Sequence, residues 1–154
     1  MSTATVSDKL KSLAKDLTKD FPRSPRETLG GYVIAGRTLD KCRSTLAGIN
    51  GEYHFNCALD KIFFEFAGIS AEDFQNFVAT GATDEEVGAW ITQHGKTRER
   101  IELVKWNNQW RYTTIRELPD GIQLYLEDYI PQVIPKGRVI YHFFDVYDIE
   151  EKRL

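Results

Sequence analysis

Helix start and stop signals recur along this chain at short intervals, and they constrain the fold more than any other feature. Ser70 and Thr83 each stand before acidic residues suited to the first turn of a helix, and Thr83 forms a capping box with Glu86. Gly48 and Gly95 follow apolar periodic segments, as helix stop signals do. Only short connections separate these signals. The pattern therefore predicts an all-α fold, a compact bundle of six or seven short helices.

The longest expected helix covers residues 25–47. Its start is marked by Ser24-Pro25-Arg26-Glu27, because Ser24 can cap the helix and Pro25 suits the first helical position. Residues 1–15 are expected either as a loose N-terminal arm or as an amphipathic helix. The other helices are expected at 59–66, 70–81, 83–95, 97–106 and 122–129, and after residue 137.

Residues 102–115 admit a second interpretation. A hairpin turning at Asn107-Asn108 would place Trp106 and Trp110 on facing strands. Asn-Gly, rather than Asn-Asn, is the strong hairpin signal, so the helix is favoured. Nothing else in the sequence requires a sheet.

Length and composition indicate one domain. The 154 residues are 42% hydrophobic and 28% charged, which is ordinary for a globular protein, and no linker rich in Ser, Gly or Pro divides residues 1–154. No apolar run reaches the roughly 20 residues that span a bilayer. Residues 1–8 lack the apolar stretch of a signal peptide, and there are only two cysteines. We therefore expect a cytoplasmic protein without a membrane segment.

The net charge of −3 conceals a basic front part. Residues 1–43 hold nine of the 20 Lys and Arg residues but only five of the 23 Asp and Glu residues. Nucleic-acid binders are usually basic overall, so the acidic balance argues against that role. The basic front part suits the binding of one small anion.

Charged side chains interrupt the apolar face of the expected helix at 25–47. At about 100° per residue, Asp40 and Arg43 fall inside the apolar arc and Arg37 lies at its edge. Buried charges need partners. Two alternatives follow: a polar pocket in which Asp40 and Arg43 hold a ligand, or internal ion pairs to a neighbouring helix. Close approach of another helix or of a ligand is expected at the glycines of this helix, Gly30, Gly31 and Gly36.

Residues 54–60 carry metal-binding and nucleophilic side chains at every third position. His54, Cys57 and Asp60 all belong to types that bind zinc, but no second Cys/His pair follows, so no metal is expected. Cys57 activated by His54 is one reading, and a buried, inert Cys57 is the favoured one. Together with Asn56 these residues complete the expected ligand site.

Arg23 and Arg26 flank the expected start of the long helix. A helix N-terminus attracts anions, and two guanidinium groups there suit a phosphate or a carboxylate. The alternative is that Ser24 and Glu27 satisfy the free N–H groups and that both arginines are solvated.

Five short motifs are spread over the front half of the chain. They are Asp16-Leu17-Thr18 with Phe21-Pro22-Arg23-Ser24-Pro25, Leu29-Gly30-Gly31-Tyr32, Arg37-x-x-Asp40-Lys41-x-Arg43, Gly51-x-Tyr53 and Leu59-Asp60. In these motifs the chain resembles a family of small bacterial proteins catalogued only as a domain of unknown function. The resemblance begins at Asp16 and is looser around Asn107. It implies a bacterial, cytoplasmic, single-domain protein and carries over no activity, cofactor or catalytic residue.

Two functions follow from these observations. The first is binding of a small anionic molecule in a polar pocket between helices, with catalysis left open and no cofactor implied. Its expected ligand residues are Arg37, Asp40, Arg43, His54, Asn56, Cys57 and Asp60, with Arg23 and Arg26 as an outer anion clamp. The alternative is a protein–protein interaction module or a homo-oligomer such as a dimer, without catalysis. It would bind through an exposed aromatic patch drawn from Phe63, Phe64, Phe74, Phe77 and Trp90.

Overall fold

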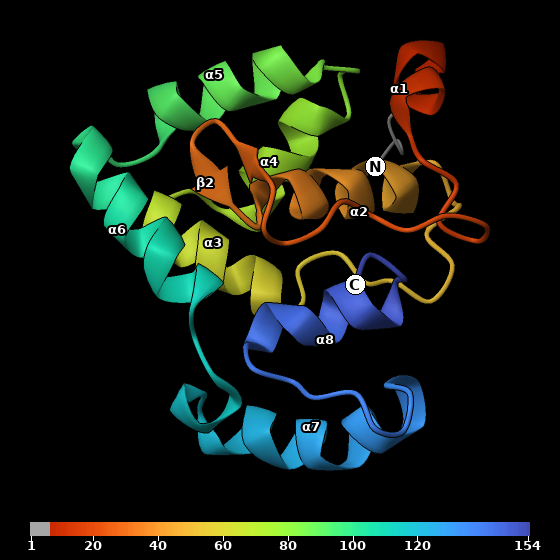
Figure 1. The fold of residues 1–154 in the computed structure, drawn as a ribbon. Helices are drawn as coiled ribbons and strands as arrows, with labels where there is room; N and C mark the ends of the chain where they lie inside the picture. The colour runs from red at the N-terminus through yellow and green to blue at the C-terminus, as the bar shows by residue number, and fades with distance from the viewer. Residues whose placement is uncertain (1–6) are drawn as a thin grey trace. The chain divides into compact units, whose positions relative to one another are not determined.

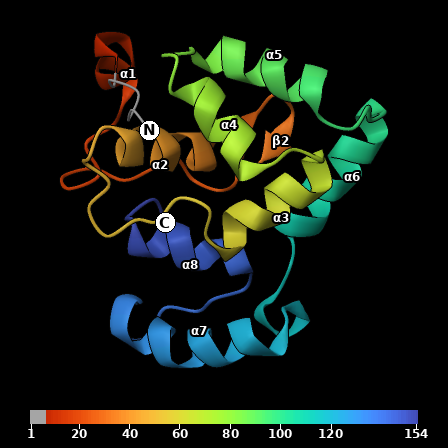
Figure 2. The same ribbon diagram turned by 180° about the vertical axis from the view of Figure 1, so that it is seen from behind.

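The computed structural model describes residues 7–154 and divides into two compact units, one ending at Glu99 and the other running from Arg100 to Leu154. Figures 1 and 2 show the order of their elements from two sides. The described residues form eight α-helices, one 3-10 helix and one two-stranded hairpin, which confirms the predicted all-α class. A single domain stays a prediction.

The helix α2 (Ala35–Leu46) is the central element of the first unit. Every residue from Ala35 to Ser44 is buried, and α2 contacts four elements that surround it. These are α1 (Asp8–Leu13), β1 (Thr28–Leu29), α3 (Ala58–Ala67) and α4 (Ala71–Val78). The sequence predicted a buried arc on this helix, whereas the helix is enclosed on all sides.

The expected helix at 25–47 is wrong over residues 25–34. Thr28–Leu29 pairs antiparallel with β2 (Tyr32–Val33), and Gly30 and Gly31 form the two-residue turn between them with φ of 60° and 89°. A two-residue turn with positive φ at both positions is the geometry in which glycine is favoured. The glycines therefore make a hairpin, and the turn at Gly30 lies against the backbone of Gly88.

The local capping signals are confirmed. Ser70 accepts a hydrogen bond from the N–H of Asp73 at the start of α4, and Thr83 forms the expected capping box with Glu86. That box opens α5 (Asp84–His94), which ends before Gly95 as expected. Gly68 ends α3 in the left-handed conformation with φ of 75°. These caps fix the directions of α3, α4 and α5.

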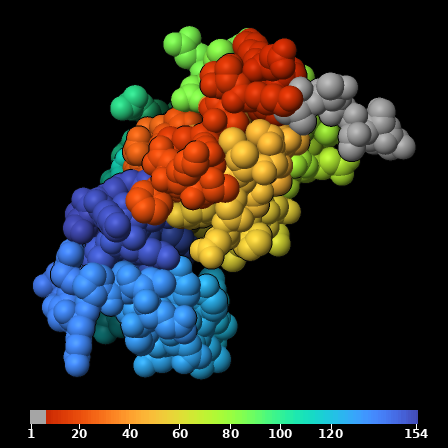
Figure 3. Space-filling model, turned by 90° about the vertical axis from the view of Figure 1, so that its right-hand side faces the viewer, coloured from red at the N-terminus to blue at the C-terminus, as the bar shows by residue number. Residues whose placement is uncertain are grey.

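The segment before α2 is attached to the loop after it. The N–H of Leu17 donates to the carbonyl of Ile49 at 2.9 Å. A Cβ on Gly51, whose φ is +55°, would lie 2.6 Å from the carbonyl oxygen of Leu17, so only glycine fits there. Figure 3 shows the red and orange surface of this segment directly against amber atoms of the following part of the chain. Of the predicted arm, α1 is helical from Asp8 to Leu13, and residues 1–6 lie outside the described residues.

The second unit consists of α6 (Arg100–Arg111), the 3-10 helix η1 (Ile115–Glu117), α7 (Asp120–Val133) and α8 (Phe143–Glu150). Residues 100–111 are helical, so the hairpin alternative at 102–115 is wrong. The helix expected at 122–129 continues through Pro131, and the last helix begins at Phe143 rather than soon after residue 137. Among the described residues, no helix is both long and apolar enough to cross a membrane.

Candidate functional site

The charged residues predicted on α2 face partners outside that helix. The Asp40 carboxylate accepts hydrogen bonds from the backbone N–H of Arg23 at 2.8 Å and from its guanidinium at 3.0 and 3.1 Å. Arg23 also donates to Asp84 at 2.8 Å, and Arg43 donates to the same carboxylate at 2.8 Å. Arg43 further donates to the carbonyl of Ala82 at 2.9 Å. We call Arg23, Asp40, Arg43 and Asp84 the Arg23 network.

The Arg23 network favours the charged forms of Arg23 and Asp84. Burial alone would lower the pKa of the Arg23 guanidinium, but the hydrogen bonds to Asp40 and Asp84 outweigh it and raise that pKa. Burial alone would raise the pKa of the Asp84 carboxyl, but the guanidinium groups of Arg23 and Arg43 hold that pKa below its usual value. The two guanidinium groups of the network are balanced by its two carboxylates, and the ammonium of Lys15 lies 4.0 Å from the Asp40 carboxylate at its edge.

The residues predicted at 54–60 join a second cluster. Asp60 is fully buried, and its carboxylate accepts from the hydroxyl of Thr38 at 2.6 Å and from the N–H of Asn56 at 2.8 Å. The ammonium of Lys41 lies 3.0 Å from the same carboxylate and donates to Sγ of Cys57 at 3.0 Å. We call these five residues the Asp60 cluster. Its partners come from α2 and from the N-terminal end of α3, so it ties these two helices together.

The remaining predicted residues lie outside both groups. Arg37 is buried, donates to the carbonyl of Arg23 at 3.2 Å and lies over the ring of Tyr53. His54 is exposed and Arg26 is half-buried. Because α2 begins at Ala35, the helix N-terminus that supported an anion site at Arg23 and Arg26 is not present there. The N–H of Ser24 donates to the Glu27 carboxylate, and the Ser24 hydroxyl accepts from the N–H of Arg26, within a turn closed by a backbone bond from Glu27 to Ser24.

Sequence reasoning missed three residues that complete these clusters, Asp84, Lys41 and Thr38. Asp84 was assigned only to the start of a helix, and Lys41 appeared only as part of a motif. The geometry matches the ion-pair alternative for Asp40 and Arg43, although the partners are Arg23 and Asp84. Ligand binding by the predicted residues stays a prediction. No group of three or more potential metal ligands of the types His, Cys, Asp and Glu occurs within residues 7–154.

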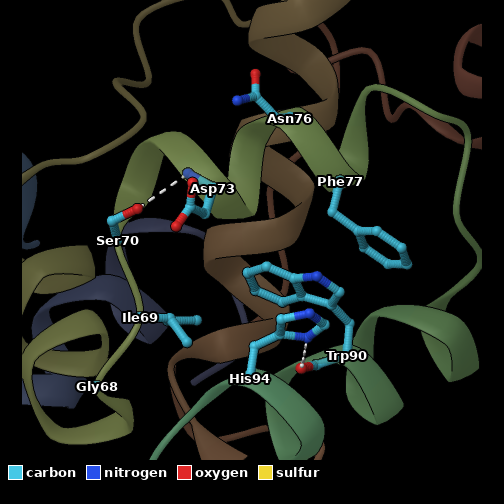
Figure 4. A pocket seen from close by; sticks show the side chains of 8 residues that line it. All are labelled: Gly68, Ile69, Ser70, Asp73, Asn76, Phe77, Trp90 and His94. Atoms are coloured by element: carbon cyan, nitrogen blue, oxygen red, sulfur yellow. Dashed lines mark hydrogen bonds between the residues drawn. The ribbon is translucent and has the colours of Figure 1, made fainter.

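An open groove lies elsewhere on the first unit, with a volume of about 530 Å³. It is lined by α4, α5 and the link between α3 and α4, and Figure 4 shows its side chains. We call it the α4–α5 groove. On α4, the spacing of Asp73, Asn76 and Phe77 places them on one side of the helix. On α5, Trp90 and His94 are four residues apart and share a face. The remaining lining residues are Gly68, Ile69 and Ser70.

Three rings form the aromatic wall of the α4–α5 groove. Trp90 is stacked with Phe77 at 5.4 Å between ring centroids and with His94 at 4.7 Å. The indole also contacts the fully buried Phe74 edge-on at 6.2 Å, which anchors the wall in the core. Nδ1 of His94 lies 3.0 Å from the carbonyl of Trp90. A carbonyl only accepts, so Nδ1 carries the proton and Nε2 of the neutral ring is an acceptor.

Several polar side-chain groups of the groove have no partner within the described part of the protein. Among the described residues, the Asp73 carboxylate, the Asn76 amide and the indole N–H of Trp90 have no hydrogen-bond or ion-pair partner. Asp73 and Asn76 are exposed, and Trp90 is half-buried. The groove therefore offers a carboxylate, an amide, an indole N–H and an imidazole nitrogen beside an aromatic wall. Within the Arg23 network and within the Asp60 cluster, by contrast, most donors and acceptors bond to other members of the same group, although Nε of the buried Arg43 has no partner in residues 7–154.

Only part of this groove had a signal in the sequence. Phe77 and Trp90 belong to the predicted aromatic patch, whereas Phe63, Phe64 and Phe74 of that patch are buried. Asp73, Asn76 and His94 stand at helical spacings that many surface residues share, so the sequence did not distinguish them.

Two comparisons with known proteins bear on the chain. No curated protein matches the chain. One family model covers residues 19–153, nearly the whole chain, including the Arg23 network, the Asp60 cluster and the α4–α5 groove. The chain therefore belongs to the family described as Domain of unknown function (DUF5069).

Proposed function

We propose that this protein binds a small molecule in the α4–α5 groove. The observation that carries the proposal is the set of uncommitted polar groups beside a rigid aromatic wall. Small-molecule sites are typically concave, mostly apolar and equipped with a few polar groups that orient the ligand. The groove volume of about 530 Å³ lies within the roughly 300–1,000 Å³ usual for such sites.

The predicted anion sites support this function less well. Arg23 and Arg43 each donate to carboxylates of the same chain, and an anion would have to displace those partners. The α4–α5 groove requires no such exchange, because Asp73 and Asn76 are free to bond with a ligand. The proposal therefore keeps the binding of a small molecule expected from the sequence, but it moves the site and does not keep the anionic charge expected of the ligand. Catalysis stays open, since the lining includes a hydroxyl at Ser70, a carboxylate at Asp73 and an imidazole at His94.

Ligand-observed NMR with a library of small ring compounds tests the proposal. We expect several compounds to receive saturation transfer from the wild-type protein and to lose it with Asn76→Ala or His94→Ala. The matched control is Gln93→Ala, an exposed change on α5 next to His94 that does not line the groove. Equal binding by all four proteins, or no binding compound in the library, would place the function elsewhere.

The other expectations from the sequence stay proposals. A bacterial, cytoplasmic setting fits the two free cysteines, Cys42 and Cys57.

Self-association or binding of a protein partner would use the half-buried remainder of the predicted aromatic patch, Phe77 and Trp90. Sedimentation of the purified protein tests that alternative, and a monomer at all concentrations argues against a dimer. The acidic balance continues to disfavour nucleic acid.

A further inference from the structure

We infer that the ligand of the α4–α5 groove is an organic cation, such as a substituted ammonium compound. The inference rests on the proposed function and names the class of ligand for the same site. Its charge would lie at the Asp73 carboxylate, and its alkyl or ring part would lie against Trp90 and Phe77.

The charges of the groove lining favour a cation. Asp73 is the one lining residue with a full charge when His94 is neutral, and its carboxylate has no ionic partner among the described residues. Figure 4 shows the carboxylate of Asp73 on the same side of α4 as Trp90. No lining residue is Lys or Arg. An anionic ligand would therefore meet repulsion from Asp73 without a compensating basic group in the lining.

The aromatic wall favours the same class of ligand. The faces of aromatic rings attract cations, and the stacked rings of Phe77, Trp90 and His94 form the aromatic surface of this wall. Trp90 is held in place by Phe77, Phe74 and His94, so a ligand would not have to order it on binding. Nε2 of neutral His94 adds an acceptor that suits a hydroxyl or N–H of the ligand.

One basic residue lies at the edge of the groove. The aliphatic stem of Lys96 packs against Gly68, and its Cγ would lie 2.8 Å from a Cβ at that position. Lys96 is exposed and does not line the groove. Its charge would favour an anion at that end, so the experiment must compare ligands of both signs.

A set of three isosteric probes tests the inference. The probes are choline, its neutral analogue with carbon in place of the quaternary nitrogen, and tert-butylacetate, which has the same bulky group and a negative charge. Binding is followed by the NMR shift of the Trp90 indole N–H, assigned from the spectrum of Trp90→Phe. We expect choline to bind wild-type protein at least about threefold more tightly than the neutral analogue.

Two neighbouring acidic residues provide a matched pair of variants. Asp73→Asn should abolish the preference for choline, whereas Glu72→Gln, an equal charge change in the same helical turn outside the groove, should retain it. Equal affinity for choline and its neutral analogue, preference for tert-butylacetate, or equal effects of the two variants would overturn the inference. Tight binding of the neutral or anionic probe would still support a small-molecule groove. If none of the three probes binds, the inference of a cationic ligand is overturned. The ligand-observed NMR experiment with the compound library then tests the proposed small-molecule function separately.

Discussion

Removal of the Asp60 carboxylate should cause the largest loss of stability of any single charge change in the first unit. The change is Asp60→Ala. The carboxylate is fully buried, and it accepts from Thr38, from the N–H of Asn56 and from the ammonium of Lys41, which is itself only 3% exposed. Its loss leaves a buried ammonium without an opposite charge, which lowers the free energy of unfolding by about 3–5 kcal/mol. Most domains have only about 5–15 kcal/mol in total.

Urea unfolding followed by far-ultraviolet circular dichroism measures this loss. The double variant Asp60→Ala/Lys41→Met removes both charges, so it should be more stable than the sum of the two single changes predicts, by at least about 1 kcal/mol. Lys9→Met is the matched control. Lys9 lies 3.7 Å from Glu86 with both side chains more than half exposed, and its replacement should change stability by less than about 1 kcal/mol. A loss below 1 kcal/mol for Asp60→Ala, or strict additivity in the double variant, would refute the reasoning about a buried charge pair.

Three further outcomes follow from the structure. The folded-state pKa of Asp84 lies below its usual value, so its stabilising contribution is present above about pH 4 and is lost as the pH falls through the lowered pKa. Acid titration of stability should therefore be flatter in Asp84→Asn than in the wild type. Burial raises the pKa of the Cys42 thiol, so a maleimide should label only the half-buried Cys57 in the folded protein and both thiols after unfolding, as mass spectrometry would report. The Tyr129 hydroxyl donates to the Glu150 carboxylate at 2.6 Å, and Tyr129→Phe should lower the free energy of unfolding in urea by about 1.5 kcal/mol.

The helices could be predicted wherever a cap determines the boundary locally. Ser70, Thr83 and Gly95 each act through bonds to neighbours a few residues away, and all three predictions are confirmed. Residues 24–27 show the limit of that logic. The N–H of Ser24 donates to the Glu27 carboxylate and the N–H of Glu27 donates to the Ser24 carbonyl, but the chain then turns into a hairpin through Gly30 and Gly31. The same local bonds serve a helix start and an isolated turn, so the sequence signal alone does not separate them.

The site residues were harder to predict because their partners are distant in the sequence. Asp40 and Arg43 were correctly singled out as charges that need partners on a buried helix. Their partners, Arg23 and Asp84, lie on a loop before α2 and at the start of α5, and only the fold brings them together. The α4–α5 groove has the same origin. Asp73 and His94 occupy ordinary exposed helical positions, and their relation to Trp90 arises from the packing of two helices.

The Arg23 network also bears on how fast the protein folds and unfolds. The hydrogen bonds from Arg23 reach Asp40, 17 residues away, and Asp84, 61 residues away. Closing so long a loop is entropically unfavourable until nearby helices have formed, so these contacts should assemble after the rate-limiting step of folding. Interactions absent from the transition state slow unfolding without speeding folding. The hydrogen bonds of Arg23 would then slow unfolding and lengthen the lifetime of the folded state, without a matching effect on the folding rate.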